Sequence, residues 1–368
     1  DAIDLLLSKN PAQYGVEIVP ENVKYPQGAE KMQIKAITNR EVKPGGLPSG
    51  VGCNVVSTYT AYTIYRACYE GIPSIERVVT VAGDCVPEAQ NLLCRFGTPL
   101  EHIFAEAGAD MSRVERICMG GPMMGKVLED QTAIEAAVVT KTTGNIIVLP
   151  KDHYLFRRAA LPMAAIRHQT RSACIQCRMC TDLCPRYLIG HQIRPNLVMR
   201  NLWREEGMED NEEYLRAFGD AANCCDCGVC EMFACPMGLS PRKVNQYIKG
   251  QLRSRGIQVP RNMEPQAREF VDQRHTPTDR LVARLGLSQY YGLHAYTCRE
   301  LHPETVFVPF SQHIGKPAIP VKAAGDHVEK GELLAQAAEG LSANIHASIA
   351  GVVEEITEKG ARIRGRKE

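Results

Sequence analysis

Nine of the fifteen cysteines lie between Cys174 and Cys235, and their spacing is the clearest chemical pattern in the chain. The first run reads Cys174-x2-Cys177-x2-Cys180-x3-Cys184-Pro185 and follows the bacterial ferredoxin pattern. The second run reads Cys224-x2-Cys227-x2-Cys230-x4-Cys235-Pro236, with one extra residue before its last cysteine. Two-residue gaps let one loop present three thiolates to one face of a cubane, while the fourth cysteine points toward another cluster. The spacing therefore predicts two [4Fe–4S] clusters and one-electron transfer.

Crossing of the two runs gives two predicted ligand sets. One cluster takes Cys174, Cys177, Cys180 and Cys235, and the other takes Cys224, Cys227, Cys230 and Cys184. Cys225 breaks the two-residue spacing, so it is predicted to be a bystander. No acid–base pair or nucleophile stands out, and no catalytic residue is predicted.

Structural zinc is the main alternative, because CxxC pairs also build tetrahedral zinc sites. A zinc site needs four ligands and usually two CxxC pairs, whereas this chain has two triplets, each with a remote Cys-Pro. A disulfide framework fits less well, because the number of cysteines is odd and they are clustered in a long chain. The pattern favours iron–sulfur clusters.

Helices are expected to position the cysteines between Leu161 and Gly250. The sequence before them has α/β character, with a helix ending in Ala2–Ser8, a short strand at Val16–Pro20, and helices over Gly28–Ile37 and Tyr59–Tyr69. Alternation predicts strands over 76–83, 92–95, 116–119 and 142–149, with a helix over Leu100–Ala107. After the charged, irregular stretch 251–300, short strands between glycines predict a small all-β sandwich from Thr305 to Arg364.

Length and charge narrow the classes of function. The 368 residues suggest two or three domains, and a net charge of +1 provides no general basic field for nucleic acid. No apolar run approaches the roughly eighteen residues of a membrane-spanning helix, and Asp1–Asn10 lacks the features of a signal peptide. We therefore expect a soluble, intracellular protein that has no transmembrane segment and binds no nucleic acid.

Three further segments carry a family resemblance: Tyr25–Lys31 (YPQGAEK), Ile75–Thr80 (IERVVT) and Gly120–Gly125 (GGPMMG). They resemble the C subunit of Rnf-type electron transport complexes and, more distantly, the flavin- and NADH-binding subunit of respiratory complex I. The resemblance implies a Rossmann-like FMN and NADH domain, then a β-grasp domain, then the two clusters. Tyr25, Gly28 and Glu30 match the family loop that borders the flavin and nicotinamide site. The glycine-rich flavin loop of the family would precede Asp1, so we expect an incomplete flavin site in this chain.

The C-terminal block from Gln312 to Val352 is similar to the barrel-sandwich hybrid domains of biotinyl and lipoyl carriers. Such carriers place a modifiable lysine at a hairpin tip, which here falls near Gly340, and no lysine lies between Gly331 and Ala347. We therefore expect no swinging carrier arm. His313 and His346 are expected to be structural, because two isolated histidines make no complete metal set.

The order of the segments indicates one branch of this family. In the Rnf proteins the hybrid domain comes before the flavin domain, whereas here it follows the clusters, as in the cobalamin reductases of propanediol-utilisation microcompartments. The resemblance implies an enzyme that passes electrons from NADH through FMN and two [4Fe–4S] clusters to a corrinoid. It also implies a cytoplasmic or microcompartment location and, as partners, a corrinoid adenosyltransferase or a microcompartment shell protein.

Two other functions stay open at this point. The chain could be an electron-wire subunit of an Rnf-like membrane NADH:ferredoxin complex, or a non-catalytic ligand-binding scaffold.

The predicted fold class is multidomain, with α/β, helical and all-β parts. The predicted divisions are a partial FMN/NADH-binding α/β domain at 1–74, a β-grasp domain at 75–150, and a two-[4Fe–4S] ferredoxin-like domain at 151–250. A connector at 251–300 and the barrel-sandwich hybrid domain at 301–368 complete the chain.

Overall fold

The structure is a computed structural model that describes residues 8–366. By their internal contacts the residues form two compact units, and each unit combines two separate stretches of the chain. The first unit takes the residues up to Val55 and Leu161–Tyr291, and the second takes Val56–Ala160 and the residues from Gly292 onward. Within the described range no helix has the length and apolar character needed to cross a membrane.

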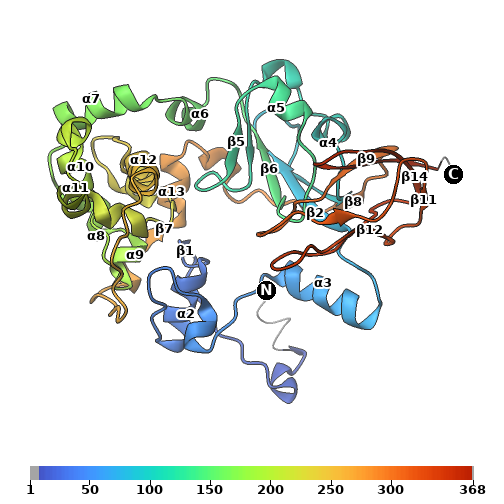
Figure 1. Cartoon of the computed structure of the whole chain (residues 1–368), viewed down its shortest axis with the longest axis horizontal. Coiled ribbons are helices and arrows are strands. Elements are labelled where there is room, and N and C mark those ends of the chain that lie inside the picture. Colours follow the sequence, from blue (N-terminus) through green and yellow to red (C-terminus); the bar gives the residue numbers. More distant parts are fainter. Residues whose placement is uncertain (1–7, 367–368) are drawn as a thin grey trace. The chain divides into compact units, whose positions relative to one another are not determined.

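Short helices joined by tight turns form the cysteine-bearing part of the first unit (Figure 1). They are α7 (Met163–Ala173), α8 (Met179–Asp182), α9 (Pro185–Leu188), α10 (Pro195–Asn201), α11 (Asn211–Phe218) and α12 (Pro241–Ser254). Further helical turns span Leu202–Gly207, Gly219–Asn223 and Cys230–Ala234. The helices α9, α10 and α12 each begin with proline, at the position where a missing N–H costs no intrahelical hydrogen bond. Fully buried Val198, Tyr214 and Ile248 tie α10, α11 and α12 into one core.

The remainder of the first unit has one small strand pair and two helices. The strand β1 (Lys24–Tyr25) pairs antiparallel with β7 (Thr276–Pro277), so segments far apart in the sequence lie side by side. The helix α2 (Glu30–Thr38) follows β1, and α13 (Thr278–Arg284) follows β7. Short 3-10 turns cover Pro11–Tyr14, Pro48–Val51, Asp272–Arg274 and Ser288–Tyr290.

A six-stranded mixed sheet forms the larger part of the second unit, in the order β5-β4-β6-β2-β3-β8. The strands are β2 (Glu76–Ala82), β3 (Gln90–Arg95), β4 (Ile117–Met119), β5 (Lys126–Leu128), β6 (Asn145–Val148) and β8 (Cys298–Glu300). The central pair β2–β6 is parallel, and β2–β3 is antiparallel. The helices are α3 (Thr58–Tyr69), α4 (Leu100–Ala107), α5 (Gln131–Glu135) and α6 (Tyr154–Ala159), with a 3-10 turn at Met111–Arg113. Leu100, Ile103 and Phe104 of α4 are buried in the same core as Val79, Val81 and Ile146 of the sheet.

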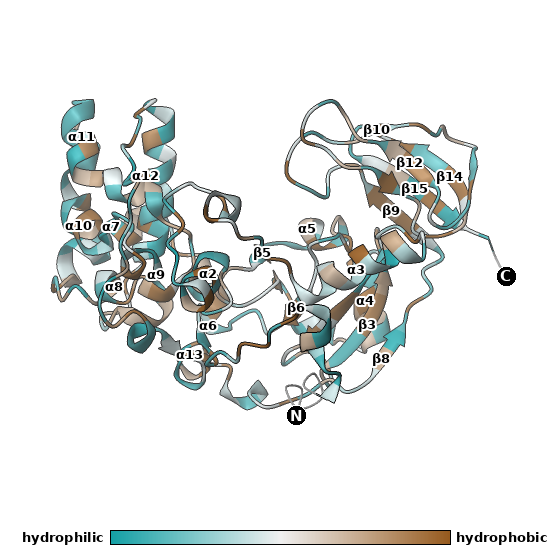
Figure 2. Cartoon of the chain, turned by 90° about the horizontal axis from the view of Figure 1, so that it is seen from below, coloured by the Kyte–Doolittle hydropathy of each residue, from teal (hydrophilic) through white to brown (hydrophobic). Residues whose placement is uncertain are grey.

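Two small sheets at the C-terminal end form a sandwich. One has the order β11-β14-β15-β9 and the other β10-β12-β13. Their strands are β9 (Thr305–Pro309), β10 (Ile319–Pro320), β11 (His327–Val328), β12 (Leu333–Gln336), β13 (Ile345–His346), β14 (Gly351–Ile356) and β15 (Gly360–Gly365). Apolar stretches of these strands are brown in Figure 2. Val308, Leu334 and Ile363 meet in one buried core.

Several predicted elements are confirmed. The structure has α4 at the predicted bounds, and β2, β3, β4 and β6 lie within one to three residues of the predicted strands. The small all-β sandwich is also confirmed, although β11 and β15 were not predicted. The order strand, strand, helix, strand in the second unit agrees with the expected β-grasp arrangement, but the β-grasp assignment itself and the five domain divisions stay predictions.

Other expectations are wrong or fall outside the described residues. Val16–Pro20 forms no strand, and Val16 and Val19 are exposed, because no described segment pairs with it as a partner strand. The stretch 251–300 is not wholly irregular, since it contains β7, α13 and β8. The helix expected over Ala2–Ser8 lies, apart from Ser8, outside the described residues.

Candidate metal centres

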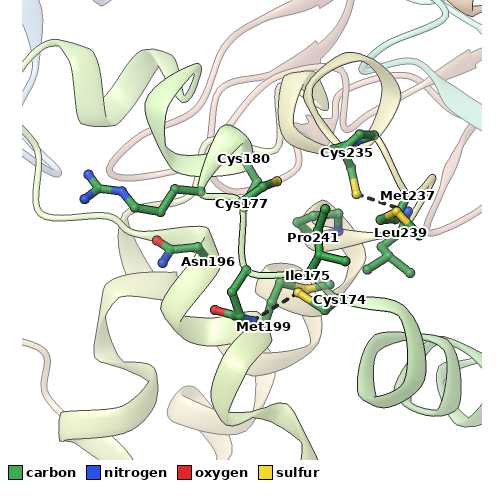
Figure 3. Close-up of a pocket in the computed structure, with 13 residues that line it drawn as sticks. Cys174, Ile175, Cys177, Cys180, Asn196, Met199, Cys235, Met237, Leu239 and Pro241 are labelled. Atoms are coloured by element: carbon green, nitrogen blue, oxygen red, sulfur yellow. Dashed lines mark hydrogen bonds between the residues drawn. The ribbon is translucent and has the colours of Figure 1, made fainter.

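A first hollow in the helical part is lined by four cysteines from both runs (Figure 3). They are Cys174, Cys177, Cys180 and Cys235, which we call the first cage. The first three come from the loop before α8 and from α8 itself, and Cys235 directly follows the turn Cys230–Ala234. Asn196 and Met199 of α10 line the same hollow. The structure thus brings together the set that the crossed pattern predicts.

A second hollow is lined by five cysteines. Four of them are the complementary predicted set, Cys184, Cys224, Cys227 and Cys230, which we call the second cage, and the fifth is Cys225. Cys184 precedes α9, and the other three belong to the second CxxCxxC loop. Arg242 and Asn245 of α12 contribute to the wall of this hollow. The two runs therefore exchange their fourth cysteines.

The two CxxCxxC loops share one backbone conformation. Gln176 and Arg178 have φ of 56° and 66° in the first loop, and Asp226 and Gly228 have φ of 59° and 79° in the second. These residues stand at equivalent positions, two and four places after the first cysteine of each loop. Left-handed residues are rare outside glycine and mark a turn that other interactions stabilise. The repeated turn wraps each loop around its hollow.

Hydrogen-bond donors point at the sulfurs of both cages. The backbone N–H of Leu239 donates to Cys235 Sγ at 3.3 Å, and that of Asp226 donates to Cys224 Sγ at 3.4 Å. The side-chain amide of Gln176 donates to Cys174 Sγ at 3.1 Å. Donors of this kind stabilise negative charge on sulfur and tune the potential of an iron–sulfur cluster.

Several of the cage thiols are buried where an isolated thiolate would be unstable. Burial, followed by the neighbouring cysteines, raises the pKa of Cys180 to about 12. Burial likewise raises the pKa of Cys184 to about 12 and the pKa of Cys230 well above the usual range for a thiol. Thiolates in such a site require a bound cation, because a coordinating metal deprotonates its thiol ligands. The donor set of four sulfurs therefore fits iron–sulfur clusters.

The arrangement of the cage cysteines also bears on whether they could bind a single zinc ion instead of a cluster. A tetrahedral zinc holds four sulfurs about 2.3 Å from one point. In the described part of the chain, no three His, Cys, Asp or Glu side chains converge closely enough to hold a single ion. The cages are instead hollows with sulfurs around their walls.

Cys225 lies in the wall of the second hollow but differs from its neighbours. Its pKa is lowered, first by a hydrogen bond from the Cys227 side chain and then by the adjacent Arg186 guanidinium. The same interaction raises the pKa of Cys227. The predicted bystander is thus close to the second cage, and its ligand status stays a prediction.

The three residues of the resembling flavin loop have different surroundings. The Tyr25 hydroxyl donates to the backbone carbonyl of Cys227 at 2.7 Å, so the structure brings Tyr25 to the second cage. Gly28 and Glu30 are exposed, in the turn before α2 and at its first residue. Their proposed flavin contacts stay predictions.

Among the residues that the structure describes, neither His313 nor His346 belongs to a group of side chains that could hold a metal ion. His313 Nε2 donates to the Lys316 carbonyl at 3.0 Å, and His346 is a strand residue of β13. Gly340 has φ of 93° and open space around it.

The cysteine spacing gave no sign of several residues that complete the hollows. Asn196 and Met199 follow Pro195, and Arg242 and Asn245 follow Pro241. A proline-led helix after each Cys-Pro is the only sequence signal that could have indicated them. The contact between Tyr25 and Cys227 had no sequence signal.

Comparisons with known proteins agree with this arrangement. A family model described as a 4Fe-4S dicluster domain matches residues 173–240, which contain both cages. A second, described as the RnfC barrel sandwich hybrid domain, matches residues 296–365. These matches confirm the predicted iron–sulfur domain and hybrid domain.

Similar proteins extend the comparison to nearly the whole chain. The cobalamin reductase PduS of Salmonella typhimurium is 36% identical over 363 residues, which cover 98% of this chain and 78% of the relative. That of Citrobacter freundii is 35% identical over the same shares. The C subunit of the ion-translocating oxidoreductase complex of Vibrio cholerae is 35% identical over 181 residues, 49% of this chain and 21% of the relative.

The two cages and these similarities define an oxidoreductase that transfers electrons through iron–sulfur clusters. More specifically, the chain belongs to the cobalamin reductase PduS family.

Proposed function

We propose that this chain passes electrons one at a time from NADH, by way of FMN and two [4Fe–4S] clusters, to a corrinoid. The observation that carries the proposal is the pair of four-cysteine cages, each completed by the last cysteine of the other run. The relation to cobalamin reductases over 98% of the chain supports a corrinoid as the acceptor.

The eight cage cysteines are the proposed iron ligands. Each loop would hold three irons of one cluster, and Cys235 or Cys184 would hold the fourth. The donors from Leu239, Asp226 and Gln176 would stabilise the negative charge of the ligand sulfurs. Burial of Cys184 and Cys230 would limit the access of water to the second cluster, whereas Cys177 leaves the first cluster nearer to solvent.

The proposed flavin residues lie in the segment that contacts the second cage. When bound, FMN supplies the conversion of a two-electron hydride donor into single electrons. Tyr25 would orient the N-terminal segment against the second CxxCxxC loop through its bond to the Cys227 carbonyl. Gly28 and Glu30, a few residues further on, would border the flavin and nicotinamide. This placement favours the second cluster as the one that receives electrons from the flavin.

The partners and location follow from the same relation. We propose a corrinoid adenosyltransferase or a microcompartment shell protein as partner, in the cytoplasm or within a microcompartment. The corrinoid would leave in a low-valent state suited to adenosylation.

A direct test starts from anaerobically reconstituted protein. Iron and acid-labile sulfide should each be present at about eight per chain, as two four-iron clusters require. The chemically reduced protein should then reduce cob(III)alamin or cob(II)alamin, with the cobalt state followed by absorbance. Intact clusters without corrinoid reduction would contradict the proposed acceptor.

A second function is favoured by the relatives that belong to ion-translocating complexes. The C subunit of the Na(+)-translocating ferredoxin:NAD(+) oxidoreductase complex of Acetobacterium woodii is 34% identical over 203 residues, 55% of this chain and 42% of the relative. This chain could accordingly be an electron-wire subunit of a similar membrane complex. Co-purification with membrane subunits in fixed ratio, without corrinoid reduction by the isolated chain, would support that function.

A further inference from the structure

The segment after the last cage cysteine has an unusual charge pattern. From Cys235 to Met263 the chain carries six arginines and lysines and no aspartate or glutamate. The whole chain, by contrast, is nearly neutral, with a net charge of +1. The cations of this segment are Arg242, Lys243, Lys249, Arg253, Arg255 and Arg261.

Three of these cations lie along one side of α12. At about 100° per residue, Arg242, Lys249 and Arg253 fall within about 40° of one another around the helix. Lys249, Arg253 and Arg261 line one open hollow, and no carboxylate lines it. Its remaining wall is mostly aliphatic, with Leu252, Ile257 and Val259. We call Lys249, Arg253 and Arg261 the basic stripe.

The basic stripe adjoins the second cage. Lys249 Nζ donates to the backbone carbonyl of Cys224 at 2.9 Å. Arg242, seven residues before Lys249 on the same side of α12, lines the second hollow itself. A molecule bound along the stripe would therefore lie against the loop that holds the second cluster.

Two members of the stripe are free to meet an outside partner. Arg253 and Arg261 are exposed, and among the described residues neither forms an ion pair. Another cation-lined hollow of this unit differs in this respect. Three of its four arginines, Arg194, Arg204 and Arg216, face the carboxylates of Asp220, Glu213 and Glu212, and only Arg200 forms no ion pair among the described residues.

We propose that the basic stripe is the docking surface for an acidic protein that carries its own one-electron centre and exchanges electrons with the second cluster. The proposal rests on the assignment of the second cage as a cluster site. It goes beyond the route through flavin, because it gives the second cluster a protein partner of its own.

The lining of the hollow favours a protein over a small anion. Lys249 and Arg253 lie on α12, Arg261 lies on the segment that follows it, and all three border one open hollow. A phosphate group would use the cations alone and leave the aliphatic side chains of Leu252, Ile257 and Val259 uncovered. An apolar floor with a charged border is also the usual anatomy of a protein interface, in which arginine is enriched. Opposite charges would speed the encounter of the two proteins.

The electron balance of the exchange is simple. The reduced carrier loses one electron and the second cluster gains one, and no covalent bond forms or breaks. Any proton that the carrier releases on oxidation goes to solvent.

The test measures binding of an acidic flavodoxin to the cluster-loaded chain by calorimetry at several salt concentrations. Arg253→Glu combined with Arg261→Glu should weaken binding about tenfold or more and flatten its salt dependence. Both side chains are exposed, so the fold and the iron content should be unchanged. The matched control is Arg200→Glu, an exposed arginine on α10 outside the stripe, with an expected change below about twofold.

Several results would overturn the docking proposal. Equal losses in Arg200→Glu and in the stripe variant would indicate general charge attraction. Equal binding of a basic cytochrome would exclude an acidic partner, and inorganic phosphate binding at the stripe without flavodoxin binding would indicate a small-anion site. Iron content and corrinoid reduction with a chemical reductant need no partner. If both persist while docking fails, only this inference is wrong.

Discussion

At the scale of single residues, cysteines of this chain differ mainly through their surroundings. The eight cage cysteines are grouped in two hollows, and burial together with neighbouring thiols raises the pKa of members such as Cys180. Cys225 is next to a cage cysteine, yet Arg186 and the hydrogen bond from Cys227 lower its pKa. Neighbouring cysteines are thus assigned different roles: Cys224 is a proposed ligand and Cys225 a proposed bystander.

The bystander prediction can be tested by iron content. Cys225→Ser should keep about eight irons per chain, because the proposed ligand set does not include it. Cys224→Ser, the matched control, should lose roughly half of the iron or fail to assemble the helical part. Loss of a cluster in Cys225→Ser, with Cys224→Ser unaffected, would reverse the assignment of the two neighbours.

His191 gives a prediction on pH dependence. Its ring is buried and its Nε2–H donates to the Val42 carbonyl at 2.8 Å. Burial, aided by the charges of Arg186 and Lys31, lowers its pKa to about 4 from 6.5. The unfolded chain therefore binds more protons between pH 4 and 6.5, so the free energy of unfolding rises with pH across that window. Between pH 5 and 7 the contribution should be about 2 kcal/mol.

Denaturant unfolding at pH 5 and pH 7 measures this effect. His191→Gln should show a pH dependence smaller by about that 2 kcal/mol, since it has no titrating ring. His168→Gln changes an exposed histidine and should behave like the unchanged protein. Acid lability of the clusters affects all three proteins alike, so the difference isolates His191. An unchanged pH dependence in His191→Gln would contradict the explanation.

At the scale of elements, the close approach of Gly97 to β9 joins two parts of the second unit. The N–H of Phe307 donates to the Gly97 carbonyl at 2.9 Å, and Gly97 itself donates to the Val139 carbonyl at 2.7 Å. Gly97 has φ of +87°, and a Cβ there would lie 2.6 Å from the Phe307 carbonyl oxygen. Glycine is thus required by both conformation and space.

A pair of glycine substitutions separates these two requirements. Gly97→Ala should lower the free energy of unfolding by more than about 2 kcal/mol, because strain and a backbone clash act together. Gly340→Ala has a similar φ of +93° but nothing within 4 Å, so it should cost about 1 kcal/mol. Urea midpoints at a constant slope give both values. Equal costs for the two variants would show that the close approach contributes nothing.

At the scale of the whole molecule, all eight cage cysteines belong to the first unit. The cores of the second unit, in the six-stranded sheet and in the sandwich, contain none of them. Metal binding to a preformed set of ligands contributes to the stability of the fold that holds them. For the described residues of the second unit we expect no such dependence.

Iron removal should therefore affect the two units differently. After oxidation and chelation, hydrogen exchange in α8, α10 and α12 should increase strongly, while β2, β3 and β14 should stay protected. Exchange measured by mass spectrometry on the loaded and stripped chain tests this directly. Equal loss of protection in both units would mean that the clusters stabilise the whole chain.

Several features followed from the sequence alone. The two CxxCxxC runs, each with a remote Cys-Pro, indicated two clusters and the crossed sets, because ligand spacing is a local property of the chain. Alternation gave β2 and β3, and helical periodicity gave α4 at its observed bounds, since each of these has enough residues to show a period.

Other features were decided only by tertiary structure. The two-residue strands β1 and β7 pair across most of the chain, and β8 joins the sheet beside β3. Strands this short carry no periodic signal, and their partners are set by long-range packing rather than by neighbouring residues. The bond from Tyr25 to the Cys227 carbonyl and the position of Lys249 beside Cys224 belong to the same class. The spacing of cysteines along the chain can predict the cluster ligands. The residues that pack against those ligands, however, depend on which distant segments of the chain bury each other's surfaces.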